Sequence, residues 1–190
     1  MLDKLLDLDT ELFVFLNGLG SPAWDGLWLA ITAKLTFVPL YALLLFLIYR
    51  KFGWKALLII MVSITFMILF TDQTTNLVKR SVHRFRPCAC DEIKDFIRFI
   101  ADRCSSNRSF FSGHASNSMA AAVFGGLVLR PYFKNLIFIL LFWAFLVAYS
   151  RIYVGVHFPL DILSGMTFGA LAGFGFYRLN KYALKRFISD

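Results

Sequence analysis

Two histidines in this chain have neighbours that could make them chemically active. His157 is followed four positions later by Asp161, and Pro159 between them suits the first turn of a helix. A carboxylate at this spacing can bind one imidazole nitrogen, fix the tautomer and leave the other nitrogen free to attack phosphorus. His114 lies on a different segment and could protonate the departing oxygen. We therefore predict that His157 is a nucleophile, that Asp161 orients it and that His114 donates a proton.

Three cationic side chains accompany these groups: Lys79, Arg86 and Arg151. Burying them is costly unless an anion neutralises them, and the arginine fork suits the oxygens of a phosphate. Ser112 and Gly113 open a predicted helix, whose N-terminal N–H groups and dipole attract an anion, and the glycine allows the backbone to come close. This set predicts phosphoryl transfer in which cationic side chains replace a metal ion, so we predict no metal and no cofactor.

The segments that would position these residues are apolar. Of 190 residues, 58% are hydrophobic and 17% are charged, and the mean hydropathy is +0.66, which is typical of a chain in a bilayer. Five apolar segments predict transmembrane helices at residues 27–49, 54–70, 114–129, 135–149 and 159–177. The third and fourth are short, since a full crossing takes about 20 residues. The expected fold is all-α, a polytopic transmembrane helix bundle of about five helices forming one domain over residues 1–190.

Residues 1–20 predict a short amphipathic helix at the membrane surface, and an ordinary flexible terminus is the alternative. Acids interrupt the apolar pattern and a basic start is missing, so we expect no removable signal peptide. The side chains expected to face lipid are Leu2, Leu5, Leu6, Phe13 and Leu16, and those expected to face water are Asp3, Asp7 and Glu11.

Basic residues near helix ends indicate the orientation of the bundle. One side carries Arg50, Lys51, Lys55, Arg130, Lys134, Arg178, Lys181, Lys185 and Arg186. Its only acid is Asp190, so the positive-inside rule makes this side cytoplasmic and places the loop 80–112 and the turn 150–158 on the opposite face. The net charge of +8 could also suggest nucleic acid, but the basic residues flank apolar segments or crowd the motif loop, so we predict no nucleic-acid partner.

Small residues recur every four positions on two of the predicted helices, a spacing that lets helices approach closely in lipid. One stripe consists of Gly165, Gly169 and Gly173, and the other of Ser118, Ala122 and Gly126. We expect the two stripes to face each other and so to bring His114 and His157 together.

Three cysteines, Cys88, Cys90 and Cys104, lie in the loop 80–112. Outside the cytoplasm, Cys104 could form a disulfide with either Cys88 or Cys90, which leaves one thiol unexplained. A zinc site made with His83 is the alternative, although the paired C-x-x-C spacing typical of such sites is missing.

Two further polar features each have two interpretations. Lys34 lies inside the first apolar segment, where it either snorkels toward the interface or extends the phosphate cradle to a second phosphate. Asp72 and Asn76 precede Lys79 and either position it or hydrate the end of a helix.

The polar clusters, taken in order, resemble the three-part signature of the type 2 phosphatidic acid phosphatase (PAP2) superfamily. The chain has K-x6-RP at residues 79–87, SGH at 112–114 and SR-x5-H-x3-D at 150–161. Phe111 stands where the family usually has proline, a departure that touches the turn rather than a catalytic group. The resemblance covers residues 72–165.

This resemblance implies a phosphohistidine on His157, aided by Asp161 and with His114 as the acid, in chemistry that needs no metal. It implies a multi-pass lipid phosphatase of the bacterial inner (cytoplasmic) membrane, with its active site facing the periplasm or outside. Its partners would be a phosphorylated lipid substrate and membrane lipids.

Within the family, undecaprenyl diphosphate is our first choice of substrate, and phosphatidylglycerophosphate or lipid A phosphates are the alternatives. A lipid phosphotransferase would use the same chemistry. A non-catalytic lipid-phosphate binding or transport protein is the alternative from another class, but binding alone needs no nucleophile such as His157. The sequence leaves open the headgroup, the lipid tail and the number of subunits.

Overall fold

The computed structural model describes residues 2–33, 35–104 and 108–188, so Lys34 and both interpretations of it lie outside the described residues. The α-helices are α1 (Leu2–Gly18), α2 (Pro22–Thr32), α3 (Val38–Val82), α4 (Gly113–Leu129), α5 (Leu136–Tyr153) and α6 (Pro159–Phe187). Two short 3-10 helices, η1 (Pro87–Ala89) and η2 (Lys94–Phe96), lie in the loop before α4. All regular secondary structure in the described ranges is helical, which confirms the predicted all-α class.

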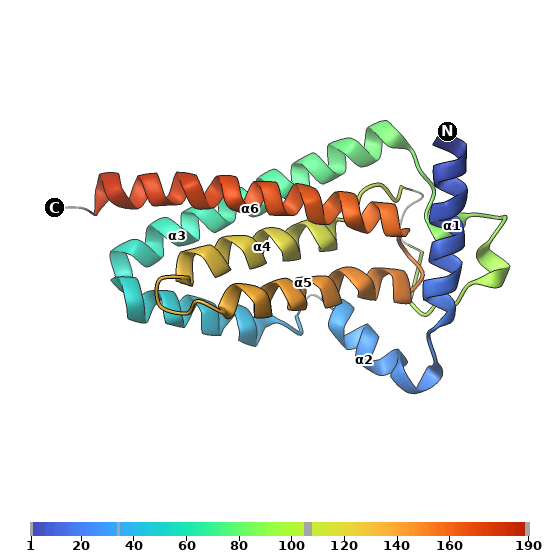
Figure 1. Ribbon diagram of the computed structural model, residues 1–190, viewed down its shortest axis with the longest axis horizontal. Helices are drawn as coiled ribbons and strands as arrows, with labels where there is room; N and C mark the ends of the chain where they lie inside the picture. Colours follow the sequence, from blue (N-terminus) through green and yellow to red (C-terminus); the bar gives the residue numbers. More distant parts are fainter. Residues whose placement is uncertain (1, 34, 105–107, 189–190) are drawn as a thin grey trace.

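Helix α3 is a hairpin of two helical arms that meet at Gly53 (Figure 1). Gly53 has φ of 78°, a left-handed backbone that glycine adopts without steric cost, so the chain reverses there. The arms cover residues 38–52 and 54–82, and with α4, α5 and α6 they form five rods that run along the long axis of the molecule.

The first predicted segment, residues 27–49, is wrong as a single helix. Helix α2 ends at Thr32 and α3 begins at Val38. Pro39 explains the break: its ring lacks an N–H and would disrupt the middle of a helix, and the structure places it in the first turn of α3 instead. The helices also extend further than predicted at two ends, to Val82 in α3 and to Phe187 in α6.

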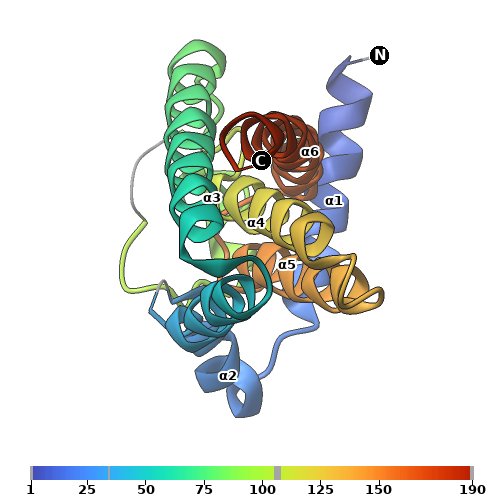
Figure 2. The ribbon, with the colours of Figure 1, turned by 90° about the vertical axis from the view of Figure 1, so that its left-hand side faces the viewer.

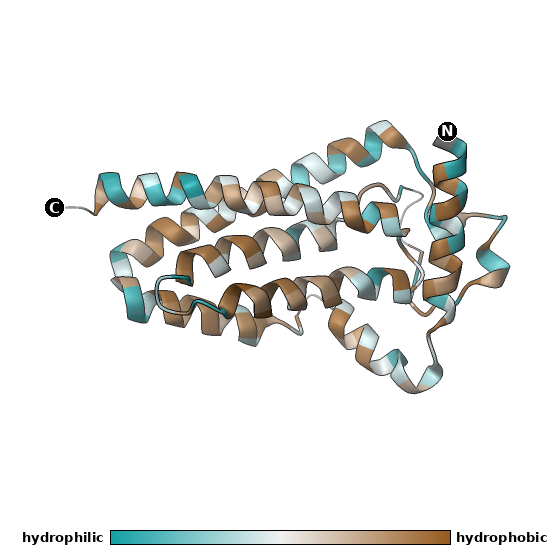
Figure 3. Ribbon diagram, in the orientation of Figure 1, coloured by the Kyte–Doolittle hydropathy of each residue, from teal (hydrophilic) through white to brown (hydrophobic). Residues whose placement is uncertain are grey.

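The rods are largely apolar along their length and more polar toward their ends (Figure 3). Large exposed side chains on the rods include Phe46, Phe66, Phe138, Phe142 and Leu171. In the part of the chain that the structure describes, three helices, α3, α5 and α6, are long and apolar enough to cross a membrane. Because a water-soluble protein rarely exposes apolar patches of this extent, lipid is the medium that suits this surface.

Helix α4 lies in the middle of the bundle, with α3, α5 and α6 around it (Figure 2). The glycines of α6 pack against α4, as predicted, but they do not contact the predicted stripe of residues 118, 122 and 126. A Cβ at Gly165 would lie 2.6 Å from the carbonyl oxygen of Ser112, and one at Gly173 would lie 2.6 Å from that of Ala120. The α6 stripe therefore packs against residue 112, which caps α4, and against residues 116 and 120 of α4.

The second predicted stripe faces a different neighbour. A Cβ at Gly126 would lie 2.9 Å from the Cα of Ile137, so Gly126 packs against α5. Ala122 belongs to the core cluster that contains Leu140 and Trp143 of α5. Two positions along a helix is a rotation of about 200°, so 118 and 122 lie roughly opposite 116 and 120. The prediction that the stripes face each other was wrong, because α4 has a close neighbour on two sides.

Helix α1 runs across the end of the bundle, at a steep angle to the rods (Figure 1). Leu5, Leu6, Leu8, Leu12 and Phe15 are exposed on it. Phe13, which was expected to face lipid, is instead fully buried, with its ring centroid 5.3 Å from that of Phe158. The N-terminal segment is thus a helix rather than a flexible terminus, and one of its faces packs on protein. The side chain of Leu2 lies outside the described ones.

Candidate active site

His157 and Asp161 lie together at the start of α6, as their spacing predicted. The turn between α5 and α6 carries His157, and α6 begins at Pro159. The Nδ1 atom of His157 lies 3.3 Å from Oδ2 of Asp161, and both side chains are buried. A positive φ of 84° at Gly155 lets the chain make this turn.

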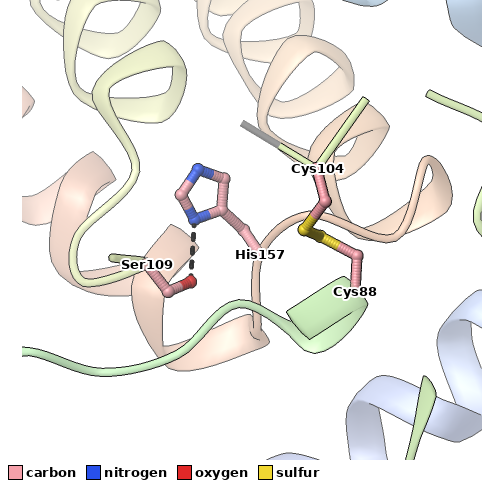
Figure 4. Close-up of a disulfide and its surroundings, with 4 residues drawn as sticks. All are labelled: Cys88, Cys104, Ser109 and His157. Atoms are coloured by element: carbon pink, nitrogen blue, oxygen red, sulfur yellow. Dashed lines mark hydrogen bonds between the residues drawn. A yellow bond between two sulfur atoms is a disulfide. The ribbon is translucent and has the colours of Figure 1, made fainter. Parts of the chain in front are cut away.

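Ser109 is a third member of this group that sequence reasoning missed. Its hydroxyl oxygen lies 3.2 Å from Nδ1 of His157, and it also bonds Oδ2 of Asp161. Figure 4 shows Ser109 on the Nδ1 side of the ring, with the other ring nitrogen pointing away from it. Ser109 lies three residues before the SGH motif, and no pattern around it marked it out.

These contacts assign the imidazole tautomer. An ionised carboxylate only accepts hydrogen bonds, so the Ser109 hydroxyl donates to Asp161 and its oxygen is left to accept. The His157 proton then sits on Nδ1, where Asp161 and Ser109 both accept it. The lone pair is on Nε2, which is the arrangement that a nitrogen nucleophile needs.

Burial lowers the pKa of the His157 imidazole to about 4. The hydrogen bond and charge of Asp161 act in the opposite direction, and the positive charges of Arg86 and Arg151 add to the lowering. At neutral pH the ring is therefore neutral, so its free nitrogen is available to form a bond.

Asp161 accepts hydrogen bonds from other donors besides His157. The backbone N–H of Phe158 donates to its Oδ2 over 3.0 Å, and Nη1 of Arg84 lies 3.0 Å from its Oδ1. Arg84 in turn binds Asp9 of α1 over 2.6 Å. Sequence reasoning missed both: Arg84 is one of the variable positions in the first motif, and Asp9 stands among other acids of α1. The one signal in the sequence was that Asp9 shares a helix face with Phe13, four residues on.

The three predicted cations lie within electrostatic reach of one another, and Lys79 and Arg86 also lie within reach of Asp161. Arg86 and Arg151 each repel Lys79, and Arg86 also repels Arg151. Arg86 is only 6% exposed, yet its Nε and Nη1 atoms have no hydrogen-bond partner among the described residues, and neither does Nε of Arg151. Nη1 of Arg151 donates to Thr32. Buried donors without partners are costly, and a bound oxyanion is the kind of ligand that would satisfy them.

Ser112 caps α4 rather than standing free for a ligand. Its hydroxyl accepts the N–H of Ala115 over 3.4 Å, and its own N–H donates to the carbonyl of Asp161 over 3.0 Å. These bonds tie the second motif to the third. The phosphate contact expected of Ser112 stays a prediction.

Gly113 has room for a side chain on the protein side. A Cβ at this position would meet only Cγ2 of Thr75, at an ordinary distance of 3.5 Å. The protein packing therefore gives no reason for a glycine here, which agrees with the expectation that a ligand approaches this backbone.

His114 and Gly113 lie in the polar part of a cavity that is otherwise mostly apolar. The cavity has a volume of about 550 Å³ and lies between both arms of α3, α4 and α5. Its apolar walls include Tyr41, Leu44, Phe124 and Trp143. A cavity of this size and lining suits an apolar ligand whose polar end is fixed by a few groups.

Asp72 and Asn117 lie at the same end of the cavity as His114. The amide of Asn117 donates to Asp72 over 2.8 Å and accepts from Thr71 over 2.6 Å. Asp72 thus has a partner on α4, while its charge also acts on Lys79.

A disulfide joins Cys88 and Cys104, which is one of the two pairings that the sequence allowed (Figure 4). Their Cα atoms are 6.0 Å apart, and Cys90 is free. Because both sulfurs are in this bond, they are not available as thiolates for the alternative zinc site with His83. Cys88 follows Pro87 directly, so the bond ties down the segment that carries Arg86.

Phe111, the residue in the place of the usual proline, packs into the bundle. It is buried, and its ring centroid lies 5.2 Å from that of Phe168 on α6. Its side chain therefore helps to hold the turn before α4 against α6.

Comparisons with family models and with known proteins agree on one family. A model of the PAP2 superfamily matches residues 56–185. A lipid A 4'-phosphatase of Bacteroides thetaiotaomicron is 35% identical over a 192-residue alignment that covers 100% of this chain and 84% of that protein. A lipid A 4'-phosphatase of Porphyromonas gingivalis is 31% identical, with 98% of this chain and 79% of that protein covered.

Solved structures have the same fold. The crystal structure of Aquifex aeolicus LpxE superposes with a TM-score of 0.67 at 26% identity, covering 90% of this chain and 95% of that one. A transmembrane PAP2-type phosphatidylglycerolphosphate phosphatase from Bacillus subtilis superposes with a TM-score of 0.74 at 22% identity, covering 97% of this chain and 89% of that one. Since the family match spans residues 56–185 and relatives more than 30% identical align over almost the whole chain, this protein belongs to the PAP2 superfamily and is a membrane lipid phosphatase of that family.

Proposed function

We propose that this protein removes a phosphate from lipid A through a phosphohistidine on His157. The sequence left lipid A phosphates open as a substrate, and two relatives that align over at least 98% of this chain bear the name lipid A 4'-phosphatase. The observation that carries the proposal is that His114 and Gly113 of the second motif line a largely apolar cavity. The cavity would take an acyl chain while His114 and Gly113, at its polar end, lie beside the phosphate.

The chemistry has two steps. In the first, Nε2 of His157 attacks phosphorus, a nitrogen–phosphorus bond forms, and the bond from phosphorus to the sugar oxygen breaks as His114 protonates that oxygen. In the second, His114 accepts a proton from water, the water oxygen attacks phosphorus, and inorganic phosphate leaves His157 neutral. Asp161 stabilises the positive charge that the imidazole acquires while it carries the phosphoryl group.

Cationic side chains would stabilise the charge on the transferring phosphoryl group. Arg86 and Arg151 have buried N–H groups without partners among the described residues, and Lys79 lies within reach of both charges. Donors already in place when the reaction begins stabilise a transition state without reorganisation. These groups supply the role that a metal ion has in other phosphoryl transfers, so activity should survive chelation.

The proposed site lies at the end of the bundle that faces away from the cytoplasm. The basic residues of the Gly53 turn, the α4–α5 connection and the C-terminal part of α6 are together at the other end (Figure 1). The disulfide between Cys88 and Cys104 supports the same orientation, because such bonds persist outside the reducing cytoplasm. In a bacterial inner membrane this would place the active site toward the periplasm.

Undecaprenyl diphosphate, the first choice from the sequence, stays a prediction. The cavity would take an isoprenoid chain as readily as an acyl chain, so its lining does not discriminate between them. An assay must also separate lipid A hydrolysis from hydrolysis of phosphatidylglycerophosphate, from phosphoryl transfer to a second lipid and from simple lipid-phosphate binding.

The test is phosphate release from purified protein in detergent with EDTA present. The panel contains lipid A, undecaprenyl diphosphate, phosphatidylglycerophosphate and phosphatidic acid, each tested with wild type, His157→Ala and His83→Ala. His83 is an exposed histidine outside the site and serves as the matched control. We expect release from lipid A by wild type and His83→Ala, and none above background by His157→Ala.

Each result has a distinct meaning. Mass spectrometry of the lipid product identifies which phosphate was lost, and trapping with labelled lipid should yield an acid-labile, alkali-stable phosphoryl group on wild type. A preference for undecaprenyl diphosphate would replace the proposed substrate but keep the chemistry. Equal release by wild type and His157→Ala would contradict the mechanism, and loss of activity with EDTA would contradict metal independence.

A further inference from the structure

We propose that Arg84 and Asp9 are positioning residues of the active site, and that through them α1 forms part of its catalytic support. Arg84 provides the charge that holds Asp161 as a carboxylate beside His157, and Asp9 holds Arg84 in place. The inference rests on the proposed phosphohistidine chemistry, and neither residue is one of the defining positions of the three motifs.

The guanidinium of Arg84 connects two carboxylates that are far apart in the sequence. Nη1 lies 3.0 Å from Oδ1 of Asp161, and Nη2 lies 2.6 Å from Oδ2 of Asp9. The two carboxylate side chains are 0% and 2% exposed, and that of Arg84 is 16% exposed. The planar fork of arginine can bind both at once, whereas the ammonium of a lysine is a single point charge.

Asp9 is fixed at both of its oxygens. While Oδ2 binds Arg84, Oδ1 accepts the backbone N–H of Leu160 over 2.8 Å. Leu160 lies in the first turn of α6, where backbone N–H groups have no partner within the helix. Asp9 therefore attaches α1 to the residue next to Asp161.

Arg84 makes two further contacts near the site, one through its backbone carbonyl and one between its guanidinium and the ring of Phe158. Its carbonyl accepts the N–H of Ser109 over 2.7 Å, which places the hydroxyl that bonds both Asp161 and His157. Its guanidinium carbon lies 4.1 Å from the centroid of the Phe158 ring, and Phe158 is the residue after the nucleophile. Arg84 thus contacts Asp161 and two residues that bond it, Ser109 and Phe158.

The charges explain what the arrangement does. When His157 is neutral, Arg84 is the full positive charge that bonds the buried Asp161, so without it a proton would be the cheapest way to neutralise that carboxylate. Two carboxylates around one guanidinium leave one net negative charge. That charge matches the positive charge that His157 acquires on attacking phosphorus, so the cluster stabilises the transition state more than the ground state.

Asp9 and Arg84 depend on each other. Burial raises the pKa of the Asp9 carboxyl, and the hydrogen bond and charge of Arg84 oppose this. Removing Arg84 leaves Asp9 buried without its counter-charge, and removing Asp9 leaves Arg84 paired with Asp161 alone. Either change shifts the position or the ionisation of Asp161. A purely structural ion pair would hold α1 on the bundle but would leave the chemistry at His157 unchanged once the protein is folded.

The experiment compares Asp9→Asn, Arg84→Gln, Arg84→Lys and the double variant with two controls. Asp7→Asn removes an exposed acid of α1, and Arg80→Gln removes an exposed arginine near the first motif. For Asp9→Asn and Arg84→Gln we expect kcat on the preferred lipid to fall about tenfold to a hundredfold with KM little changed, as for other outer partners of catalytic groups. The double variant should lose no more than the worse single variant, because the two act as one unit. Arg84→Lys should recover part of the loss.

A second readout does not depend on turnover. In protein labelled with ¹⁵N-histidine, the shifts of Nδ1 and Nε2 of His157 report which nitrogen carries the proton. We expect the proton on Nδ1 in wild type and both controls, and a mixture of tautomers in Asp9→Asn and Arg84→Gln. Thermal unfolding in detergent shows whether each variant is folded, and if Arg84→Gln is not, Asp9→Asn and Arg84→Lys decide.

Unchanged kcat and unchanged nitrogen shifts in folded Asp9→Asn and Arg84→Lys would overturn the inference. A wild type that releases phosphate from no lipid would overturn the proposed function instead, and the nitrogen shifts would then decide the positioning role alone. Full additivity of the two losses would also contradict a single unit.

Discussion

At the scale of single residues, burial determines what His157 can do. An exposed histidine beside an aspartate would gain a proton readily near neutral pH. Here burial is the largest influence and keeps the pKa of His157 at about 4, despite the carboxylate of Asp161 3.3 Å away. The bond to Asp161 therefore orients a neutral ring, whose Nε2 lone pair remains available.

We predict that His157 stays neutral from pH 8 down to about pH 5.5, well below the ordinary value of about 6.5 for histidine. The chain has three histidines, so ring ¹H–¹³C signals of ¹³C-histidine protein in detergent can be followed individually, with His157→Gln to assign the signal. A midpoint near the ordinary value would contradict this prediction.

The lowered pKa of His157 also makes the stability of the fold depend on pH. Because the pKa of His157 is lower in the folded state, the unfolded state binds the proton first. This group's contribution to stability is complete above about pH 6.5 and is lost as pH falls from there toward the folded value, by roughly 1.4 kcal/mol for each pH unit.

At the scale of helices, the position of α4 determines the geometry of the site. Its first turn carries the second motif, and Ser112 donates its N–H to the carbonyl of Asp161 on α6. Three glycines of α6 let the two backbones come this close. The spacing between the two helices is therefore coupled to the distance between the second and third motifs.

Gly169→Ala should destabilise the protein by about 1–3 kcal/mol, the usual cost of overpacking, and should lower activity. A Cβ there would lie 3.0 Å from the Cα of Ser116 and closer still to its carbonyl oxygen. Gly175 lies on the same helix, and a Cβ there would meet nothing within 4 Å. Gly175→Ala is thus the matched control and should be neutral, or stabilising by up to about 1 kcal/mol because alanine favours helix. Equal melting temperatures in detergent for the two variants would show that the close approach is not needed.

At the scale of the whole molecule, the two ends of the bundle differ in chemistry. One end has the disulfide, the motif residues and α1, and the other has the Gly53 turn and the α4–α5 connection (Figure 1). Loop 80–112 and the turn after α5 meet at the first end, as the sequence predicted. The proposed orientation makes that end extracytoplasmic.

Cys90 is the free cysteine that tests this orientation. It is partly exposed, and Cys88 and Cys104 are in the disulfide. We expect a membrane-impermeant maleimide to label Cys90 in intact spheroplasts. In a Cys90→Ser background, Asn135→Cys places a thiol at an exposed position of the opposite end, and it should react only after lysis. Labelling with the reverse pattern would mean that the active site faces the cytoplasm.

The class of fold and the proximity of His157 to Asp161 could be read from the order of the amino acids. Long apolar segments have few solutions in lipid, because every backbone polar group must bond within its own helix or within a closed barrel. His157 and Asp161 are four residues apart on one turn, so local geometry alone brings them together. Contacts of this kind are readable from spacing.

Only the tertiary structure reveals the other residues that bond His157 and Asp161. Arg84 is 75 residues from Asp9 and 77 from Asp161, and Ser109 is 48 from His157, so no local pattern predicts these bonds. The same holds for the partner of Cys104 and for the face of α4 that meets the glycines of α6. Such contacts depend on how each helix is rotated and how deeply it is inserted, and those are set by packing among all the helices at once.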